Sequence, residues 1–107
     1  MAGLVLRNEV SEFEVELSVT GPLRGTAVAE FNGLLRMLAT KAYRLITISL
    51  RECEAINSAA IGIIISVMKS LAPERALRLT GCSASLYAKL KALRLDSLIE
   101  ISGRERN

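Results

Sequence analysis

The spacing of hydrophobic residues along the chain predicts an alternation of short strands and helices. Residues 4–6 form a short apolar run, and residues 13–19 alternate apolar and polar side chains, which is typical of a half-buried strand. Asn8 and Glu9 fall near the expected turn between these two strands. Gly21-Pro22 ends the second strand, because proline has no N–H to donate and glycine permits unusual dihedral angles.

A first helix is expected after this break, with Thr26 as its N-cap. Its apolar positions recur at intervals of three and four residues and form one stripe: Val28, Phe31, Leu35 and Leu38. Residues 45–50 form an apolar run rich in β-branched side chains, as expected for a strand covered on both faces. A loop over residues 51–56 leads into a second helix over residues 58–71, which Pro73 terminates.

The last third of the chain continues the alternation. Residues 77–80 predict a strand that ends at Gly81, and Ser83 is placed to cap a third helix. The apolar positions of that helix are Leu86, Leu90 and Leu93. A final strand is expected over residues 98–101, followed by a frayed polar tail over residues 103–107.

The resulting order, β-β-α-β-α-β-α-β, predicts an α/β fold. Alternating strands and helices imply parallel strands joined by right-handed crossovers, so we expect a mixed, largely parallel sheet of four to five strands with helices packed on it. The 107 residues suit one domain spanning 1–107. Half of the residues are hydrophobic, which favours either a large core or an apolar surface that meets a partner.

Charge and hydropathy limit the partners and the cellular location that we expect for the protein. The net charge of +3 is scattered and the basic residues are not interleaved with aromatic ones, so no nucleic-acid partner is expected. The most apolar stretch, residues 55–68, falls short of the roughly 20 residues of a membrane span. Residues 1–6 lack the charged leader of a signal peptide. We therefore expect a cytoplasmic protein without membrane insertion.

The chemistry-bearing residues argue against catalysis. The chain has no histidine, and Cys53 and Cys82 form no CxxC pair, so neither a metal site nor a Cys-His nucleophile is expected. No glycine-rich phosphate-binding motif occurs, and no cofactor is predicted. Both cysteines are interpreted as free thiols that pack as small hydrophobic residues.

The segment that leads into the second predicted helix contains the candidate functional residues. The apolar strand over residues 45–50 leads through a loop to Asn57 and Ser58, which begin an almost wholly apolar helix. A helix N-terminus carries unpaired N–H groups and a partial positive charge, so a phosphate on Ser58 would meet a favourable field of about 0.3–1 kcal/mol. The simpler interpretation is that Ser58 only caps the helix. The two roles are compatible if Asn57 is the cap and Ser58 is exposed.

At this point the sequence resembles the STAS family, which includes anti-sigma factor antagonists and domains of sulfate transporters. The resemblance covers residues 13–102. The matching motifs, in chain order, are Gly21-Pro22-Leu23-Arg24, the strand over 46–50, Asn57-Ser58-Ala59-Ala60, the strand over 77–80 with Gly81, the helix over 83–93, and Arg94-Leu95. Each motif is short, and the specificity comes from their order.

The resemblance implies a function in bacterial signalling. It places Ser58 at the family's phosphoacceptor position and implies a partner-binding surface formed by Arg24, Asn57, Ser58, Ala59, Ala60 and Gly62. The implied partner is an anti-sigma factor with serine kinase activity or another STAS-type signalling protein, in a homo- or hetero-oligomer. Arg24 and Asn57 stand where the family often has acidic residues, and Ala60 stands in place of its usual glycine.

Two alternatives to a phosphorylation switch stay open. The chain could be a constitutive structural subunit of a transport ATPase or of a signalling scaffold, without phosphorylation. Its altered Asn57 and Ala60 and its apolar composition favour this reading. It could also be a ligand sensor that uses a cleft beside Gly21 and Ser58, although nothing in the sequence selects a ligand.

Overall fold

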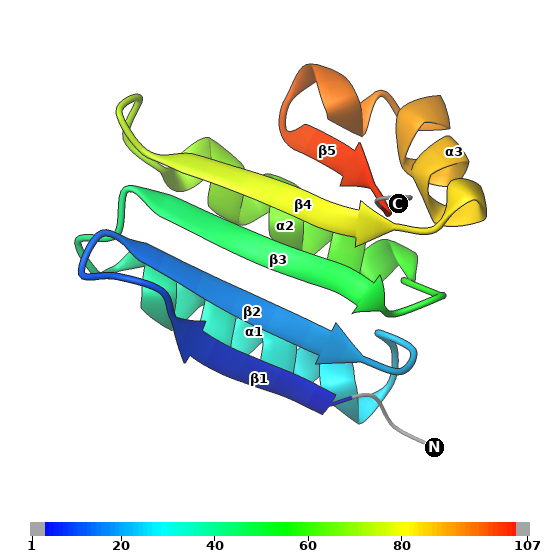
Figure 1. Ribbon diagram of the computed structural model, residues 1–107, viewed down its shortest axis with the longest axis horizontal. Helices are drawn as coiled ribbons and strands as arrows, with labels where there is room; N and C mark the ends of the chain where they lie inside the picture. The colour runs from blue at the N-terminus through cyan, green and yellow to red at the C-terminus, as the bar shows by residue number, and fades with distance from the viewer. Residues whose placement is uncertain (1–3, 105–107) are drawn as a thin grey trace.

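The computed structural model describes residues 4–104, which form a five-stranded sheet and three α-helices. The strands lie side by side in chain order: β1 (Leu4–Glu9), β2 (Glu14–Thr20), β3 (Leu45–Glu52), β4 (Ala76–Cys82) and β5 (Glu100–Gly103). β1 is antiparallel to β2, while β2 to β5 run parallel to one another, as the arrows in Figure 1 show. The predicted mixed, largely parallel sheet and its element order are confirmed.

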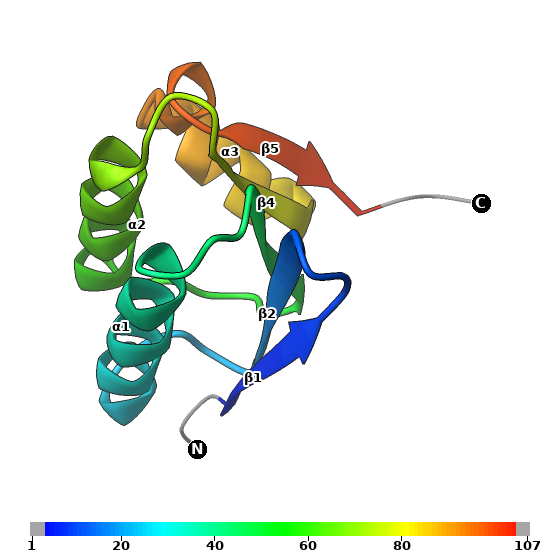
Figure 2. The same ribbon diagram turned by 90° about the vertical axis from the view of Figure 1, so that its left-hand side faces the viewer.

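The helices follow the parallel strands: α1 (Thr26–Ala39), α2 (Ser58–Ser70) and α3 (Ala84–Ala92), with a short 3-10 helix η1 (Leu95–Ser97) after α3. α1 and α2 lie next to each other on one face of the sheet, and α3 packs near β4 and β5 (Figure 2). Because β2, β3 and β4 are parallel, all three helices begin at the same edge of the sheet, which we call the carboxyl edge. Within residues 4–104, no helix combines the length and apolarity that crossing a membrane requires.

The core lies between the sheet and α1 and α2. The alternation of β2 is confirmed, since Val15, Leu17 and Val19 are buried under the helices. The predicted stripe of α1 buries Phe31, Leu35 and Leu38 fully, whereas Val28 is only partly buried and Ala27 takes the core position in the first turn.

The expectation that the strand over residues 45–50 is covered on both faces is wrong. Ile46, Ile48 and Leu50 face the helices, but among residues 4–104 no helix covers the opposite face of the sheet (Figure 2). Thr47 lies on that face and is nevertheless buried. Arg78 of β4 donates from Nε to Thr47 Oγ1 at 3.0 Å, so the neighbouring strand contributes to its cover.

The start of α1 also differs from the prediction. Thr26 is the first helical residue and Gly25 is the N-cap, with no side-chain hydrogen bond. Gly25 has φ 62° and ψ −136°, a conformation that glycine adopts readily and that side chains with a Cβ disfavour. The chain therefore enters α1 through a backbone conformation, and the Thr26 hydroxyl is not its cap.

The last strand begins later than predicted. Arg94 adopts left-handed dihedrals at φ 61°, and η1 then buries Leu95 before β5 starts at Glu100. As a result Leu98 lies outside the strand and is 46% exposed, and Leu93, expected in the core, is 56% exposed. The polar tail predicted from residue 103 is wrong for its first two residues: Gly103 pairs with Cys82, and Arg104 donates its N–H to Cys82 O at 3.0 Å. Residues 105–107 lie outside the described part.

Cys53 and Cys82 are free and buried, as predicted. Burial raises the pKa of Cys82 from 9.0 to about 11, and the neighbouring Cys53 makes a smaller contribution. Burial also raises the pKa of Cys53. Between pH 9 and 11 the unfolded chain loses thiol protons that the folded chain keeps, so stability falls as pH rises through this window. Urea unfolding at pH 8, 9 and 10 measures this. Cys82→Ala should show a shallower loss than the parent, and an equal slope would contradict the assignment.

Candidate functional site

The loop before α2 continues the sheet beyond the end of β3. Leu23, which follows β2, and Ile56 form an isolated parallel bridge. Leu23 donates its N–H to Ala55 O at 2.8 Å, and its carbonyl accepts from Asn57 N at 3.2 Å. These bonds fix the backbone at the point where α2 begins. They also place Arg24, the residue after Leu23, next to Asn57, although the two are 33 positions apart in sequence.

Asn57 is the N-cap of α2. Its Oδ1 accepts a hydrogen bond from Ala60 N at 2.9 Å, and its backbone is extended, with φ −89° and ψ 171°. This satisfies one of the N–H groups that the first turn of a helix leaves unpaired. The interpretation of Ser58 as the cap is therefore wrong. Ser58 is the first residue of α2 and its side chain is exposed, which is the arrangement that leaves its hydroxyl free for another role.

The structure divides the predicted partner-binding residues into two groups. Arg24, Ser58, Ala59 and Gly62 are exposed and Asn57 is half-buried, so these five residues define a surface at the carboxyl edge that we call the α2-start surface. Ala60 is fully buried. Its inclusion in the predicted set is corrected, because a methyl group in the core cannot touch a partner. The substitution of alanine for the family's glycine there is a matter of packing.

Gly62 lies on the solvent side of α2 and does not serve close packing of the helix on the sheet. It is exposed, and a Cβ built on it would meet nothing within 4 Å. Gly62→Ala should therefore stabilise the protein by up to about 1 kcal/mol, since glycine in a helix interior is less favourable than alanine by that amount. Gly33→Ala on α1 is the matched control, because Gly33 is equally open. Thermal unfolding measures both, and a lower melting temperature for Gly62→Ala would show that its surroundings are closed.

A lysine that sequence reasoning missed also holds this loop. Lys89 of α3 donates from Nζ to Ile56 O at 3.0 Å, two residues before Ser58. Lys89 lines a shallow pocket together with Glu54 of the same loop, so side chains of both charges lie there. No sequence signal could have identified Lys89, because it lies 33 residues from Ile56 and only the packing of α3 brings the two together.

The site has the chemistry of a binding surface. Among residues 4–104, no cluster of three or more histidine, cysteine, aspartate or glutamate side chains is arranged to hold a metal ion. Ser58 lies at the positive end of α2, which favours a negative charge on or near its hydroxyl. The neighbouring positions Ala59 and Gly62 carry small side chains, so another protein can approach the helix backbone closely.

Comparison with solved structures places this geometry among known folds. The chain is similar to an anti-sigma factor antagonist from Mycobacterium paratuberculosis, with a TM-score of 0.84 and 13% identity over 94% of this chain and 86% of that one. It is similar to the phosphorylated form of the Bacillus cell fate determinant SpoIIAA, with a TM-score of 0.73 and 16% identity over 92% and 90%. It is also similar to a sulfate transporter family protein from Wolinella succinogenes, with a TM-score of 0.73 and 15% identity over 91% and 82%.

A search among curated proteins finds no match to the sequence. The identities to the solved structures are low, so these similarities establish the fold alone. The STAS domain family model, in contrast, matches residues 7–107, which is nearly the whole sequence. The chain therefore belongs to the STAS domain family.

Proposed function

We propose that this STAS domain is a cytoplasmic protein-interaction module that acts as an anti-sigma factor antagonist and is switched by phosphorylation of Ser58. The observation that carries the proposal is the geometry at the start of α2, where Asn57 caps the helix and Ser58 is exposed. The fold shared with anti-sigma factor antagonists supports a protein partner. The chain's contribution is binding, not catalysis, and the partner is a serine kinase that is also an anti-sigma factor.

The physical basis of the switch is a charge that the fold tolerates and the partner does not. A phosphate adds about −1.5 to −2 charges at neutral pH. At the first position of α2 this charge interacts favourably with the helix dipole, so the domain stays folded. In the complex the same phosphate would be desolvated against partner groups selected to fit a neutral hydroxyl. The phosphate therefore weakens binding without destabilising the fold.

Binding of the anti-sigma factor kinase from the same organism tests this proposal. Ser58→Asp should lower its affinity by more than about tenfold in calorimetry, since about 2–5 kcal/mol is lost when a charge is buried without a partner at an interface. Its melting temperature should equal or exceed that of the parent. Ser66→Asp, on an exposed position two turns further along α2, is the matched control and should have a smaller effect.

Two outcomes would contradict the switch. One is equal affinity of the parent and Ser58→Asp together with no phosphate on Ser58 in the protein purified from its own cells. The other is a large loss of stability in Ser58→Asp, which would show that the hydroxyl is not free. Gly62→Ala adds an independent check, because the added methyl group should weaken binding while it stabilises the fold. Gly33→Ala should only stabilise the fold.

A second candidate function is that of a constitutive subunit in a transport assembly or a signalling scaffold. The similarity to a sulfate transporter family protein favours it, as does Asn57 in place of the family's acidic residue. In this case the α2-start surface would bind its partner permanently. Capture from cell extract with the parent and with Ser58→Asp separates the two functions: a transport ATPase retained equally by both variants would support the second.

A further inference from the structure

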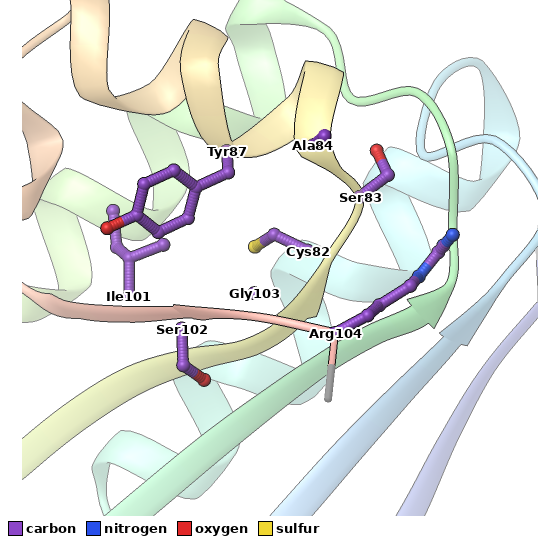
Figure 3. A pocket seen from close by; sticks show the side chains of 8 residues that line it. All are labelled: Cys82, Ser83, Ala84, Tyr87, Ile101, Ser102, Gly103 and Arg104. Carbon is purple, nitrogen blue, oxygen red and sulfur yellow. The ribbon is translucent and has the colours of Figure 1, made fainter. Parts of the chain in front are cut away.

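One pocket in the described part of the chain has no part in the proposed switch. Its volume is about 620 Å³, within the range of small-molecule sites, and it lies where α3 begins beside the end of β5 (Figure 3). Both β4 and β5 end here, so the pocket is at the carboxyl edge of the parallel sheet. Ligands of open α/β sheets characteristically bind at this edge.

The pocket has an apolar end and a polar end. Tyr87 and Ile101 are on the same side of the view, and the buried Cys82 lies between them and Arg104 in it (Figure 3). Ser83 and Arg104 lie toward the other side (Figure 3). None of the residues that line the pocket is acidic, and Arg104 is the one charged residue among them.

The guanidinium of Arg104 is held in place by one hydrogen bond, but its Nη2 atom makes none. Its Nε donates to Gly81 O at 3.1 Å, which fixes the group beside the pocket. Its Nη2 has no access to solvent and makes no hydrogen bond of suitable geometry, although it lies 2.8 Å from Glu54 Oε2. The Glu54 side chain is 69% exposed and the Arg104 side chain 32%, so solvent screens the carboxylate more than the guanidinium. An anion with better geometry could therefore displace Glu54.

We propose that this pocket binds a small organic anion. Its carboxylate or phosphate group pairs with Arg104 in place of Glu54, and its flat apolar part lies against Tyr87 and Ile101. A guanidinium presents two parallel donors that match such oxyanions, which explains why an arginine suits this position. The start of α3 adds a positive potential to that of the arginine. This site is separate from Ser58 and requires no protein partner.

Phenyl phosphate is the probe that tests the proposal, with inorganic phosphate as its anionic part and benzyl alcohol as an uncharged aromatic comparison. In amide NMR titrations of the full chain, phenyl phosphate should give saturable shifts at Ser83, Ala84, Gly103 and Arg104. It should bind about tenfold more tightly than inorganic phosphate, because its ring buries apolar area against Tyr87. Benzyl alcohol, which lacks the charge, should bind more weakly than phenyl phosphate.

Two substitutions then test the arginine that would bind the anion and the carboxylate that would compete with it. Arg104→Gln should weaken phenyl phosphate binding by about tenfold or more, as expected for the loss of a charged hydrogen-bond donor. Glu54→Gln should strengthen binding, because it removes the competing carboxylate, and a purely structural role of the ion pair would not produce this gain. Lys91→Gln, an exposed charge change on α3 outside the pocket, is the matched control.

Several results would overturn the site. They are the absence of saturable shifts up to the solubility limit of the probe, shifts centred elsewhere in the protein, and equal binding by Arg104→Gln and the parent. If Arg104→Gln does not fold, Arg104→Lys takes its place, since it keeps the charge but loses the forked donors. It should bind phenyl phosphate more weakly than the parent, and equal binding would again overturn the proposal.

Discussion

The Gly81→Ala variant is expected to lose about 3 kcal/mol of unfolding free energy, which corresponds to a fall of roughly 12 °C in melting temperature for a domain of this size. Gly81 lies in β4 with φ +71°, a left-handed conformation that costs a residue with a Cβ about 1–2 kcal/mol. A Cβ there would also lie 3.0 Å from the N, Cα and Cβ atoms of Arg51. Since two of these atoms are backbone, side-chain rotation cannot relieve the contact, and the ends of β3 and β4 must move apart.

The Gly81→Ala substitution should also disturb the pairing of β4 with β5. β4 and β5 shift register between Leu79 and Cys82, so Gly81 lies inside the irregular segment that aligns β5. Gly103→Ala is the matched control in the same corner, because its Cβ would meet only Cys82 O at an ordinary 3.6 Å. It should change stability by less than about 0.5 kcal/mol. Chemical denaturation measures both variants, and a loss below about 1 kcal/mol for Gly81→Ala would contradict the strained backbone.

The second large effect is expected from Arg75→Ala, at the opposite edge of the sheet. Arg75 precedes β4 and donates from Nε to Tyr43 O at 2.7 Å and from Nη1 to Ala39 O at 2.7 Å. Ala39 is the last residue of α1, and Tyr43 lies just before β3. One guanidinium therefore ties together the end of a helix and the starts of two strands. Carbonyl groups at a helix C-terminus carry partial negative charge and favour a cation.

Removal of this side chain leaves those carbonyl groups without a charged donor in a partly buried site. We expect a loss of about 2–4 kcal/mol, since each hydrogen bond to a charged group contributes about 1.5–3 kcal/mol. Arg75→Lys should recover only part of the loss, because an ammonium cannot span both carbonyls as the guanidinium does. Chemical denaturation provides the measurement, and full recovery by lysine would show that charge alone is required.

Arg44→Ala is the matched control for Arg75→Ala. Arg44 directly follows Tyr43 and stacks over the ring of Phe13 at 5.8 Å, but it is exposed. An exposed contact of this kind contributes about 0.5–1 kcal/mol, so Arg44→Ala should cost less than half of the effect of Arg75→Ala. Because Arg75 lies at the edge remote from the α2-start surface, the folded fraction of Arg75→Ala should bind a protein partner as the parent does.

Local signals were sufficient to predict most of the elements. Asn57 and Ser83 stand before apolar helical segments, and the structure has both as N-caps, with hydrogen bonds to Ala60 N and Leu86 N. The alternation within β2 placed its buried face correctly. These successes share a cause: the information lies within a few residues along the chain, where capping preferences and side-chain periodicity act directly.

The errors share a different cause. Thr26 resembled a cap, but the dihedral angles of Gly25 decide where α1 starts. The final apolar run resembled a strand over 98–101, but η1 takes up part of it and delays β5 to Glu100. Both Gly62 and Ala60 lie on an apolar helix, and sequence alone could not tell which of them faces the sheet. In each case, the outcome depends on how the chain turns in space.

The sequence by itself therefore determined the order of strands and helices and the presence of Asn57 and Ser58 at the start of α2, because each follows from residues close together in the chain. The order of the short motifs along the chain indicated the family. Only the tertiary structure decided which distant residues lie near the start of α2. The bridge between Leu23 and Ile56 brings Arg24 there, and the packing of α3 brings Lys89 there. The tertiary structure also decided that Arg104 meets Glu54 beside a pocket. These contacts join segments separated by more than thirty residues, and their positions are set by the parallel sheet, whose carboxyl edge collects loops that the sequence keeps apart.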